Sequence, residues 1–179
     1  MAAKKEALET DVIDLTKTEE FLMEAFAGES QANRKYTAFA AQADKEGLAQ
    51  AARLFRAAAE AEAVHAANHL RALKAIKSTK ENLREAIAGE THEFKEMYPE
   101  MIAAAKEEGA KDAERSFNYA NAVEEYHAKL YHGILEDLEA KKEIYPYYVC
   151  PVCGMTVERE APEKCPVCGV KGSMFKRIE

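Results

Sequence analysis

The stretch EAVHA at residues 62–66 lies in a run so rich in alanine that it predicts a helix, and it sets Glu62 and His65 one helical turn apart. A closely similar stretch, EEYHA, follows at residues 124–128, which is 62 residues later. AGES at 27–30 and AGET at 88–91 repeat at an offset of 61 residues. The helical region is therefore interpreted as an internal repeat of one helix pair, with approximate two-fold symmetry.

Four long helical segments are predicted around these repeats, and Pro, Gly and Cys dominate the sequence after them. Thr18 is the predicted N-cap of the first segment, and Gly47 follows its end. Pro99 lies inside the third segment, where its missing N–H predicts a kink. Short connections between long helices favour antiparallel neighbours and hence an all-α four-helix bundle. The expected segments run over roughly 18–46, 48–76, 80–108 and 111–143.

Length and charge exclude several classes of protein. The 179 residues suffice for one domain and a small appendage, and the formal net charge of −7 argues against nucleic acid as a partner. No apolar run reaches the roughly 20 residues that span a bilayer, so no membrane interaction is expected. The first 14 residues have no apolar core and do not resemble a secretory signal, so we expect a cytoplasmic protein.

Each helical segment places one glutamate on its apolar face. A single glutamate in so charged a chain is usually a solvated surface residue. Four uncompensated inward carboxylates would be costly, however, and no lysine or arginine shares their helical phase. Two divalent cations would balance the four charges. A glutamate from each of two helices and Glu-x-x-His from each of the other two is the ligand pattern of di-iron carboxylate bundles. The residues that fit it are Glu29, Glu62, His65, Glu90, Glu124 and His127.

Three further residues lie close to this pattern. Glu93 stands three residues after Glu90 and is either a fifth carboxylate ligand, which would favour the oxidised irons, or a solvated flank residue. Tyr36 and Tyr98 either donate hydrogen bonds to ligand carboxylates or pack in the core. We predict that all three take part in catalysis. His69, His92 and His132 fit the helical phase or spacing poorly and are not expected to bind metal.

The C-terminal segment carries two copies of CPVCG, at 150–154 and 165–169. In a reducing cytosol, two such pairs predict a tetrahedral four-thiolate metal site rather than disulfides. The segment is too short to build its own core and needs the metal to fold. Spacing alone leaves iron and zinc equally open. The expected domains are 1–145, the bundle, and 146–179, with ligands Cys150, Cys153, Cys165 and Cys168.

With these motifs in this order, the chain resembles the rubrerythrin family over nearly its whole length. The resemblance implies a ferritin-like di-iron bundle joined to a rubredoxin-like iron domain, and a cytoplasmic enzyme that reduces hydrogen peroxide during oxidative stress. It assigns all seven bundle ligands named above, Glu93 included, and the four cysteines to iron. It also implies that one iron exchanges Glu93, its partner when oxidised, for His65 when reduced.

Electron counting agrees with a peroxidase. Reduction of peroxide to water takes two electrons and two protons. Two ferrous ions can supply both electrons, and a four-thiolate iron can return them singly. Two alternatives compete with it: a ferritin-like ferroxidase, which has no need of an electron-delivering tail, and a non-enzymatic bundle with a zinc ribbon, which would not need inward carboxylates.

The expected partners are hydrogen peroxide, an electron donor such as a rubredoxin or an NAD(P)H-dependent reductase, and a second copy of the chain. A bundle made from a repeated helix pair favours a homodimer, with helix pairs exchanged between subunits as one form of it. The short linker around 145–148 further suggests that the tail cannot reach the di-iron ligands of its own chain.

Overall fold

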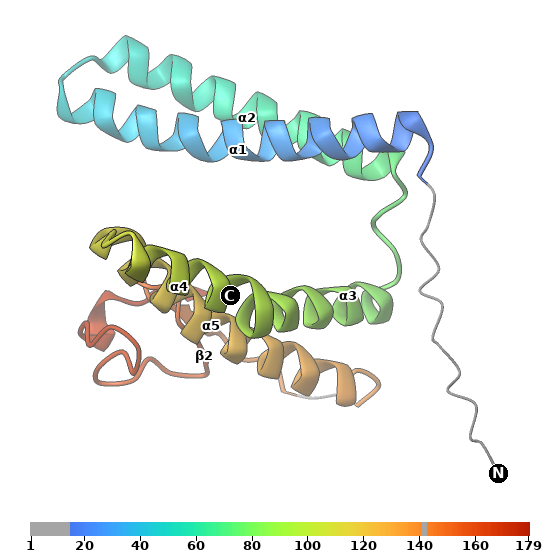
Figure 1. Cartoon of the computed structure of the whole chain (residues 1–179), viewed down its shortest axis with the longest axis vertical. Coiled ribbons are helices and arrows are strands. Elements are labelled where there is room, and N and C mark those ends of the chain that lie inside the picture. Colours follow the sequence, from blue (N-terminus) through green and yellow to red (C-terminus); the bar gives the residue numbers. More distant parts are fainter. Residues whose placement is uncertain (1–14, 141–142) are drawn as a thin grey trace. The chain divides into compact units, whose positions relative to one another are not determined.

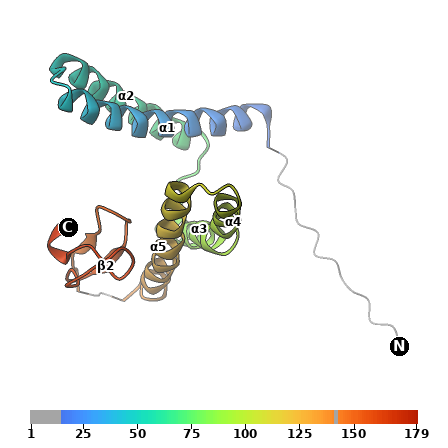
Figure 2. The same cartoon turned by 60° about the vertical axis from the view of Figure 1, so that its left-hand side comes forward.

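The computed structural model describes residues 15–140 and 143–179, and it divides into two compact units between Lys77 and Ser78. The first unit is hairpin one, in which α1 (Lys17–Lys45) packs along α2 (Ala49–Ala72). The second unit contains hairpin two, in which α3 (Thr79–His92), η1 (Glu93–Met97) and α4 (Tyr98–Glu107) pack along α5 (Lys111–Glu136). Figures 1 and 2 show each hairpin as a pair of neighbouring helical rods.

Both hairpins begin with the same capping device. The Thr16 hydroxyl accepts a hydrogen bond from the Glu19 N–H, and the Glu19 carboxylate accepts one from the Thr16 N–H. Ser78 and Glu81 repeat this reciprocal arrangement at the start of α3. Each box satisfies two backbone donors that an isolated helix start leaves free. The predicted cap at Thr18 is therefore wrong by two residues, because Thr16 is the residue with a glutamate three positions on.

Two helices end earlier than the sequence predicts. Lys74 adopts a φ of 52°, in the left-handed region, so α2 stops at Ala72 instead of near residue 76. The last helix stops at Glu136, since Asp137 leaves helical geometry with φ −105° and ψ 11°. Residues 141 and 142 of its predicted extension lie outside the described residues. Gly47 takes a φ of 75° after α1, as expected of a glycine that ends a helix.

The interruption predicted at Pro99 takes the form of a π-turn. Residues Glu93–Met97 are π-helical, and the Tyr98 N–H reaches back five residues to the Glu93 carbonyl. Pro99 then falls in the first turn of α4, where a missing N–H costs no helical hydrogen bond. The π-turn adds one residue to the path between Glu90 and Tyr98, which are eight residues apart. Their counterparts Glu29 and Tyr36 are seven apart.

The C-terminal part, the four-cysteine domain (147–179), contains a small antiparallel sheet of order β2-β1-β3. Strand β1 (Tyr147–Val149) lies between β2 (Thr156–Glu158) and β3 (Lys176–Ile178), with Tyr148 opposite both Val157 and Arg177. The rest is loop and a 3₁₀ turn, η2 (Gly172–Met174). Figure 2 shows this domain beside α5, in agreement with the contacts between α5 and β2.

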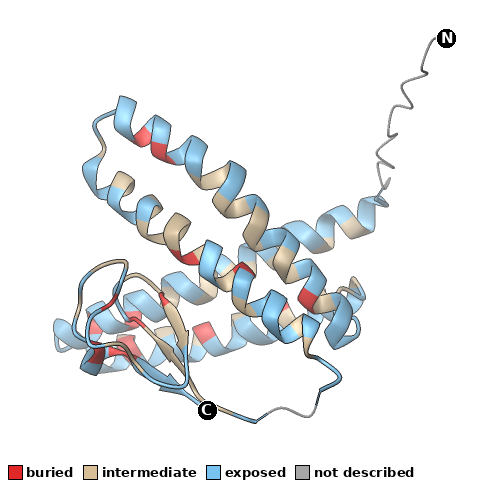
Figure 3. Ribbon diagram, turned by 90° about the horizontal axis from the view of Figure 1, so that it is seen from below, coloured by how far each residue is buried: buried red, intermediate tan, exposed pale blue. Residues whose placement is uncertain are grey.

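Small side chains dominate the core of hairpin one. Figure 3 colours the buried residues of the helices red. Its fully buried residues are all alanines, among them Ala52 and Ala59. Alanine lets two helices approach closely but removes little apolar surface from water per residue. Large side chains such as Phe21, Phe39 and Leu54 remain exposed. Hairpin one therefore carries apolar surface that its own two helices do not bury.

Candidate metal centres

Hairpin one brings Glu29 of α1 together with Glu62 and His65 of α2. One ligand atom from each lies within 4.8 Å of the others. The His65 Nδ1 is 2.8 Å from a Glu62 oxygen and 3.7 Å from a Glu29 oxygen. The i, i+3 spacing in α2 stacks Glu62 and His65 on one face, as the sequence predicts.

Hairpin two builds the same cluster from Glu90 of α3 with Glu124 and His127 of α5, again with one ligand atom from each within 4.8 Å. The His127 Nδ1 is 2.7 Å from a Glu124 oxygen and 3.6 Å from a Glu90 oxygen. The two clusters match to within a tenth of an ångström in these distances. Each is half of the predicted six-ligand set, and its carboxylate oxygens and imidazole nitrogen suit iron.

Electrostatics make the cluster of hairpin two receptive to a cation. Burial, and then the charge of Glu124, raise the pKa of Glu90 from 4.5 to about 7, against the opposing effect of His127. Burial is also the main reason that the pKa of Glu124 is raised. The ionised forms of two such neighbouring carboxylates repel each other. A bound metal cation stabilises both of them and takes the place of a proton.

Glu93 lies close enough to this cluster to act on it. It is half-buried in the π-turn, and its charge contributes to the raised pKa of Glu90 and of Glu124. Burial and then Glu93 raise the pKa of Tyr98, whose ring packs against Phe117 at 6.3 Å between centroids. Glu93 is not one of the three residues whose ligand atoms group most tightly.

Tyr36 and Tyr131 differ in their surroundings. Tyr36 packs in hairpin one with Phe39 and Phe55, at 6.2 Å between ring centroids in both pairs. Tyr131 was not among the predicted site residues, and its pKa is raised by burial and then by Glu90 and Glu124. The signal that could have identified it is its i+4 position from His127, which places both side chains on one face of α5.

Two of the three histidines that were not expected to bind metal make surface pairs. The His92 Nδ1 is 3.1 Å from Glu96, and the His132 Nδ1 is 3.7 Å from Glu136. Neither belongs to a metal-binding group among the residues that the structure describes.

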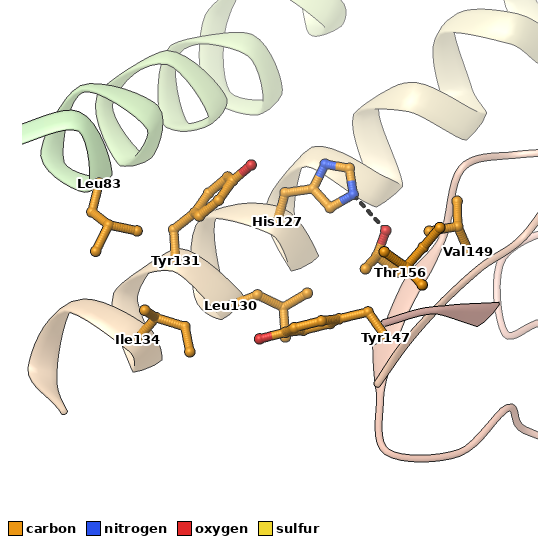
Figure 4. Close-up of a pocket in the computed structure, with 9 residues that line it drawn as sticks. Leu83, His127, Leu130, Tyr131, Ile134, Tyr147, Val149 and Thr156 are labelled. Carbon is orange, nitrogen blue, oxygen red and sulfur yellow. Dashed lines mark hydrogen bonds between the residues drawn. The ribbon is translucent and has the colours of Figure 1, made fainter. Parts of the chain in front are cut away.

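The four-cysteine domain contacts α5 beside the second cluster. Val123 of α5 is buried in one apolar group with Cys150 and Met155, and the His127 Nε2 lies 3.0 Å from the Thr156 hydroxyl (Figure 4). The expectation that the linker keeps the tail away from the ligands of its own chain is therefore wrong for hairpin two.

The four cysteine sulfurs have the spacing of a metal site. Cys150 and Cys168 are 3.6 Å apart, and Cys153 and Cys165 are 3.5 Å apart. Four thiolates at about 2.3 Å from one ion lie roughly 3.8 Å apart, whereas a disulfide needs about 2.05 Å. Burial disfavours the Cys165 thiolate, but N–H groups of Cys168 and Val167 outweigh it and lower the pKa of that thiol to about 7. The residues fit a four-thiolate iron.

Comparison with known proteins follows the same division. The family described as Rubrerythrin matches residues 20–135, and the family described as Rubrerythrin, rubredoxin-like domain matches residues 148–176. The chain belongs to the rubrerythrin family. It is 38% identical to Rubrerythrin-2 of Clostridium acetobutylicum over 175 residues, which cover 89% of this chain and 95% of the relative. It is 37% identical to a rubrerythrin of Porphyromonas gingivalis over 199 aligned positions, covering 100% of this chain and 98% of that one.

A solved structure of nigerythrin in a mixed-valence state is also similar. It has 33% identity, a TM-score of 0.56, and a match that covers 96% of this chain and 91% of the other. Membership confirms the predicted fold class, a ferritin-like helical domain with a small rubredoxin-like domain. Rubrerythrins are iron-binding oxidoreductases, and the two carboxylate–histidine clusters and the four cysteines confirm the predicted iron cofactors. Among the described residues, no helix is long and apolar enough to cross a membrane.

Proposed function

We propose that the chain is a non-haem di-iron peroxidase that reduces hydrogen peroxide to water and protects against oxidative stress. The observation that carries the proposal is the contact between a di-iron ligand, His127, and the domain that holds the four cysteines. A protein that only oxidised and stored iron would have no use for it. The proposed bundle ligands are Glu29, Glu62, His65, Glu90, Glu93, Glu124 and His127. The proposed tail ligands are Cys150, Cys153, Cys165 and Cys168.

When bound, the bundle irons supply the two electrons that peroxide needs, and the tail iron returns them singly. The chain's own residues hold the charge and the protons. Four glutamates balance two ferrous ions, and Glu93 is near enough to offset part of the charge added on oxidation. Glu93 and Tyr98 lie beside the cluster and are the proposed sources of the two protons that balance the reaction. We propose Tyr36 as the corresponding residue of hairpin one.

We further propose that the site is completed by both hairpins and that the protein works as a homodimer. Each cluster offers three ligand atoms, which is half of what two irons need. The apolar side chains that hairpin one leaves exposed need a covering surface. Hairpins of one chain, or hairpins exchanged between two chains, would meet both requirements. The proposed electron donor is a rubredoxin or an NAD(P)H-dependent reductase in the cytoplasm. The proposed boundary between the bundle and the four-cysteine domain lies between residues 145 and 146.

The test is a comparison of two activities of the iron-loaded protein. Under anaerobic conditions, with an NADH-driven electron donor, we expect sustained consumption of peroxide. With ferrous iron supplied in excess and no donor, we expect no accumulation of ferric iron beyond the bound ions. Accumulation of many ferric ions per chain without peroxide turnover would instead establish the ferritin-like ferroxidase.

A further inference from the structure

His127 is held from both sides of its ring. Its Nδ1 faces the carboxylates, 2.7 Å from Glu124 and 3.6 Å from Glu90. Its Nε2 points the opposite way, to the Thr156 hydroxyl at 3.0 Å (Figure 4). Thr156 begins strand β2 of the four-cysteine domain, so this hydrogen bond joins the helical ligand set to the tail.

The hydrogen bonds continue from Thr156 to the first cysteine knuckle. The Thr156 hydroxyl donates to the Gly154 carbonyl at 3.1 Å, and the Gly154 N–H donates to the Cys150 carbonyl at 3.0 Å. Gly154 follows Cys153 directly in the chain. Two hydrogen bonds and a few covalent bonds therefore separate the His127 ring from a cysteine ligand.

The donor and acceptor roles in these hydrogen bonds are those required when the Nδ1 of His127 binds a metal. A metal-binding Nδ1 must present its lone pair, so the Nε2 carries the proton and donates it to the Thr156 oxygen. The hydroxyl proton of Thr156 is then free for the Gly154 carbonyl. With the other tautomer, Thr156 would have to donate to the Nε2 and would leave the carbonyl without that donor. The contact with Gly154 thus selects the tautomer of His127 in which Nδ1 can bind iron.

Packing brings the two partners together. Val123, one turn before His127 on α5, is buried against Cys150, which begins the first cysteine knuckle, and Met155, which follows it. The Thr156 and His127 side chains form the polar end of a pocket of about 370 Å³ whose other walls are mostly apolar, including Leu130 and Val149. Apolar walls give the hydrogen bond few competitors.

We propose that Thr156 is a positioning residue that orients His127 for iron and carries the hydrogen-bonded route from the four-cysteine iron to the di-iron site. The inference rests on the proposed peroxidase function and deepens it. In each transfer one electron leaves the ferrous tail site and one ferric bundle ion is reduced, and no bond forms or breaks. The route enters through the Cys150–Gly154 knuckle.

The decisive variant is Thr156→Val, which keeps the shape of the side chain and removes the hydroxyl. Thr156→Ser restores the hydroxyl, and Thr37→Val removes a hydroxyl that donates to the Asn33 carbonyl in hairpin one. The first readout is NMR of the full chain loaded with zinc. The Nε2 proton of His127 should be protected from exchange in the parent and in Thr156→Ser, and should exchange rapidly in Thr156→Val.

The second readout is kinetic and uses the iron-loaded, fully reduced protein. After peroxide oxidises the bundle, the red colour of the ferric tail should appear about tenfold more slowly in Thr156→Val, at the lower end of what loss of an outer hydrogen-bond partner costs a metal site. Thr156→Ser and Thr37→Val should match the parent.

The outcomes separate the inference from the function on which it rests. Unchanged protection of the Nε2 proton and an unchanged rate of tail oxidation in Thr156→Val would overturn the role of Thr156 while leaving the peroxidase intact. A parent bundle that peroxide fails to oxidise would overturn the peroxidase, and the NMR readout would still decide whether Thr156 orients His127.

Discussion

The two hairpins carry the same Glu, Glu, His pattern but surround it differently. The His65 side chain is 52% exposed, and among the described residues its bonds are to the carboxylates of its own cluster. The His127 side chain is 27% exposed and is also fixed by Thr156. The repeat places the same ligand types in both hairpins, whereas the surroundings leave His65 more exposed and less restrained than His127. His65 is therefore the imidazole suited to the redox-linked exchange that family resemblance implies.

The hairpins also differ by one residue. Glu90 and Tyr98 are separated by one residue more than Glu29 and Tyr36, and the π-turn absorbs the difference. This turn carries Glu93, which stands where hairpin one has Ala32. Hairpin two therefore has a carboxylate that hairpin one lacks, and His65 in hairpin one has the freedom that His127 lacks.

The largest expected effect concerns the four-cysteine domain that contacts hairpin two. Cys165→Ser should remove the red colour and abolish steady-state peroxide reduction with an external donor, because the four-thiolate site loses a ligand. Single-turnover oxidation of the chemically reduced bundle should survive. Visible spectra and NADH-coupled assays measure both, with the exposed Val152→Ala as the control. Full steady-state activity without tail iron would refute the electron route.

Removal of each histidine tests the comparison directly. His127→Ala should weaken iron binding at least about tenfold in both oxidation states, since the fixed ligand serves in each. His65→Ala should keep iron when oxidised, because Glu93 substitutes, and should lose it on reduction. Iron analysis after gel filtration of oxidised and reduced samples measures this. Equal losses in the two variants in both states would remove the distinction between fixed and mobile ligands.

Glu93→Ala makes hairpin two resemble hairpin one. It should still bind two irons through the other six ligands but lose peroxide reactivity roughly a hundredfold, the scale of a general acid–base contribution. Oxygen reactivity should fall much less. Glu96→Ala is the matched control, because Glu96 lies in the same turn and pairs with His92 at the surface. An unchanged ratio of peroxide to oxygen rates would make Glu93 a flank residue.

The smallest expected effect is the pH dependence of the metal-free protein. The pKa of Glu90 is raised from 4.5 to about 7 by burial and by Glu124, so the folded state holds a proton that the unfolded state has released. The contribution of Glu90 to the free energy of unfolding should be most favourable below pH 4.5 and should decline as the pH rises through 7. The loss should be about 1–2 kcal/mol, since the side chain keeps solvent contact.

Urea unfolding of the metal-free parent and of Glu90→Gln, from pH 5 to pH 8, isolates this effect. The difference between the two proteins should shift in favour of Glu90→Gln as the pH rises. A difference that stays constant across the range would show that Glu90 has an ordinary pKa in the metal-free protein.

Much of the site could be predicted because helical periodicity shows which glutamate and histidine side chains share one face of a helix. Two Glu-x-x-His pairs and two AGE segments at matching offsets specify the residues of both clusters. Thr156 could not be found in this way, because it lies in a strand 29 residues after His127 and forms its contact through tertiary packing. The π-turn left a trace in the offsets of 61 and 62, but only the backbone shows where the extra residue is accommodated. The ends of α2 and α5 depend on the backbone torsions of Lys74 and Asp137. Residue type is a weak guide to such torsions, so these helix ends could not be predicted from the sequence.

The most direct test of the account is stopped-flow mixing of the fully reduced, iron-loaded protein with peroxide and, separately, with oxygen. We expect one equivalent of peroxide to oxidise both bundle irons, and the red colour of the tail to follow as its electron passes through the Thr156 contact. We expect oxygen to react much more slowly. Rapid oxidation by oxygen with little response to peroxide would contradict the proposed peroxidase.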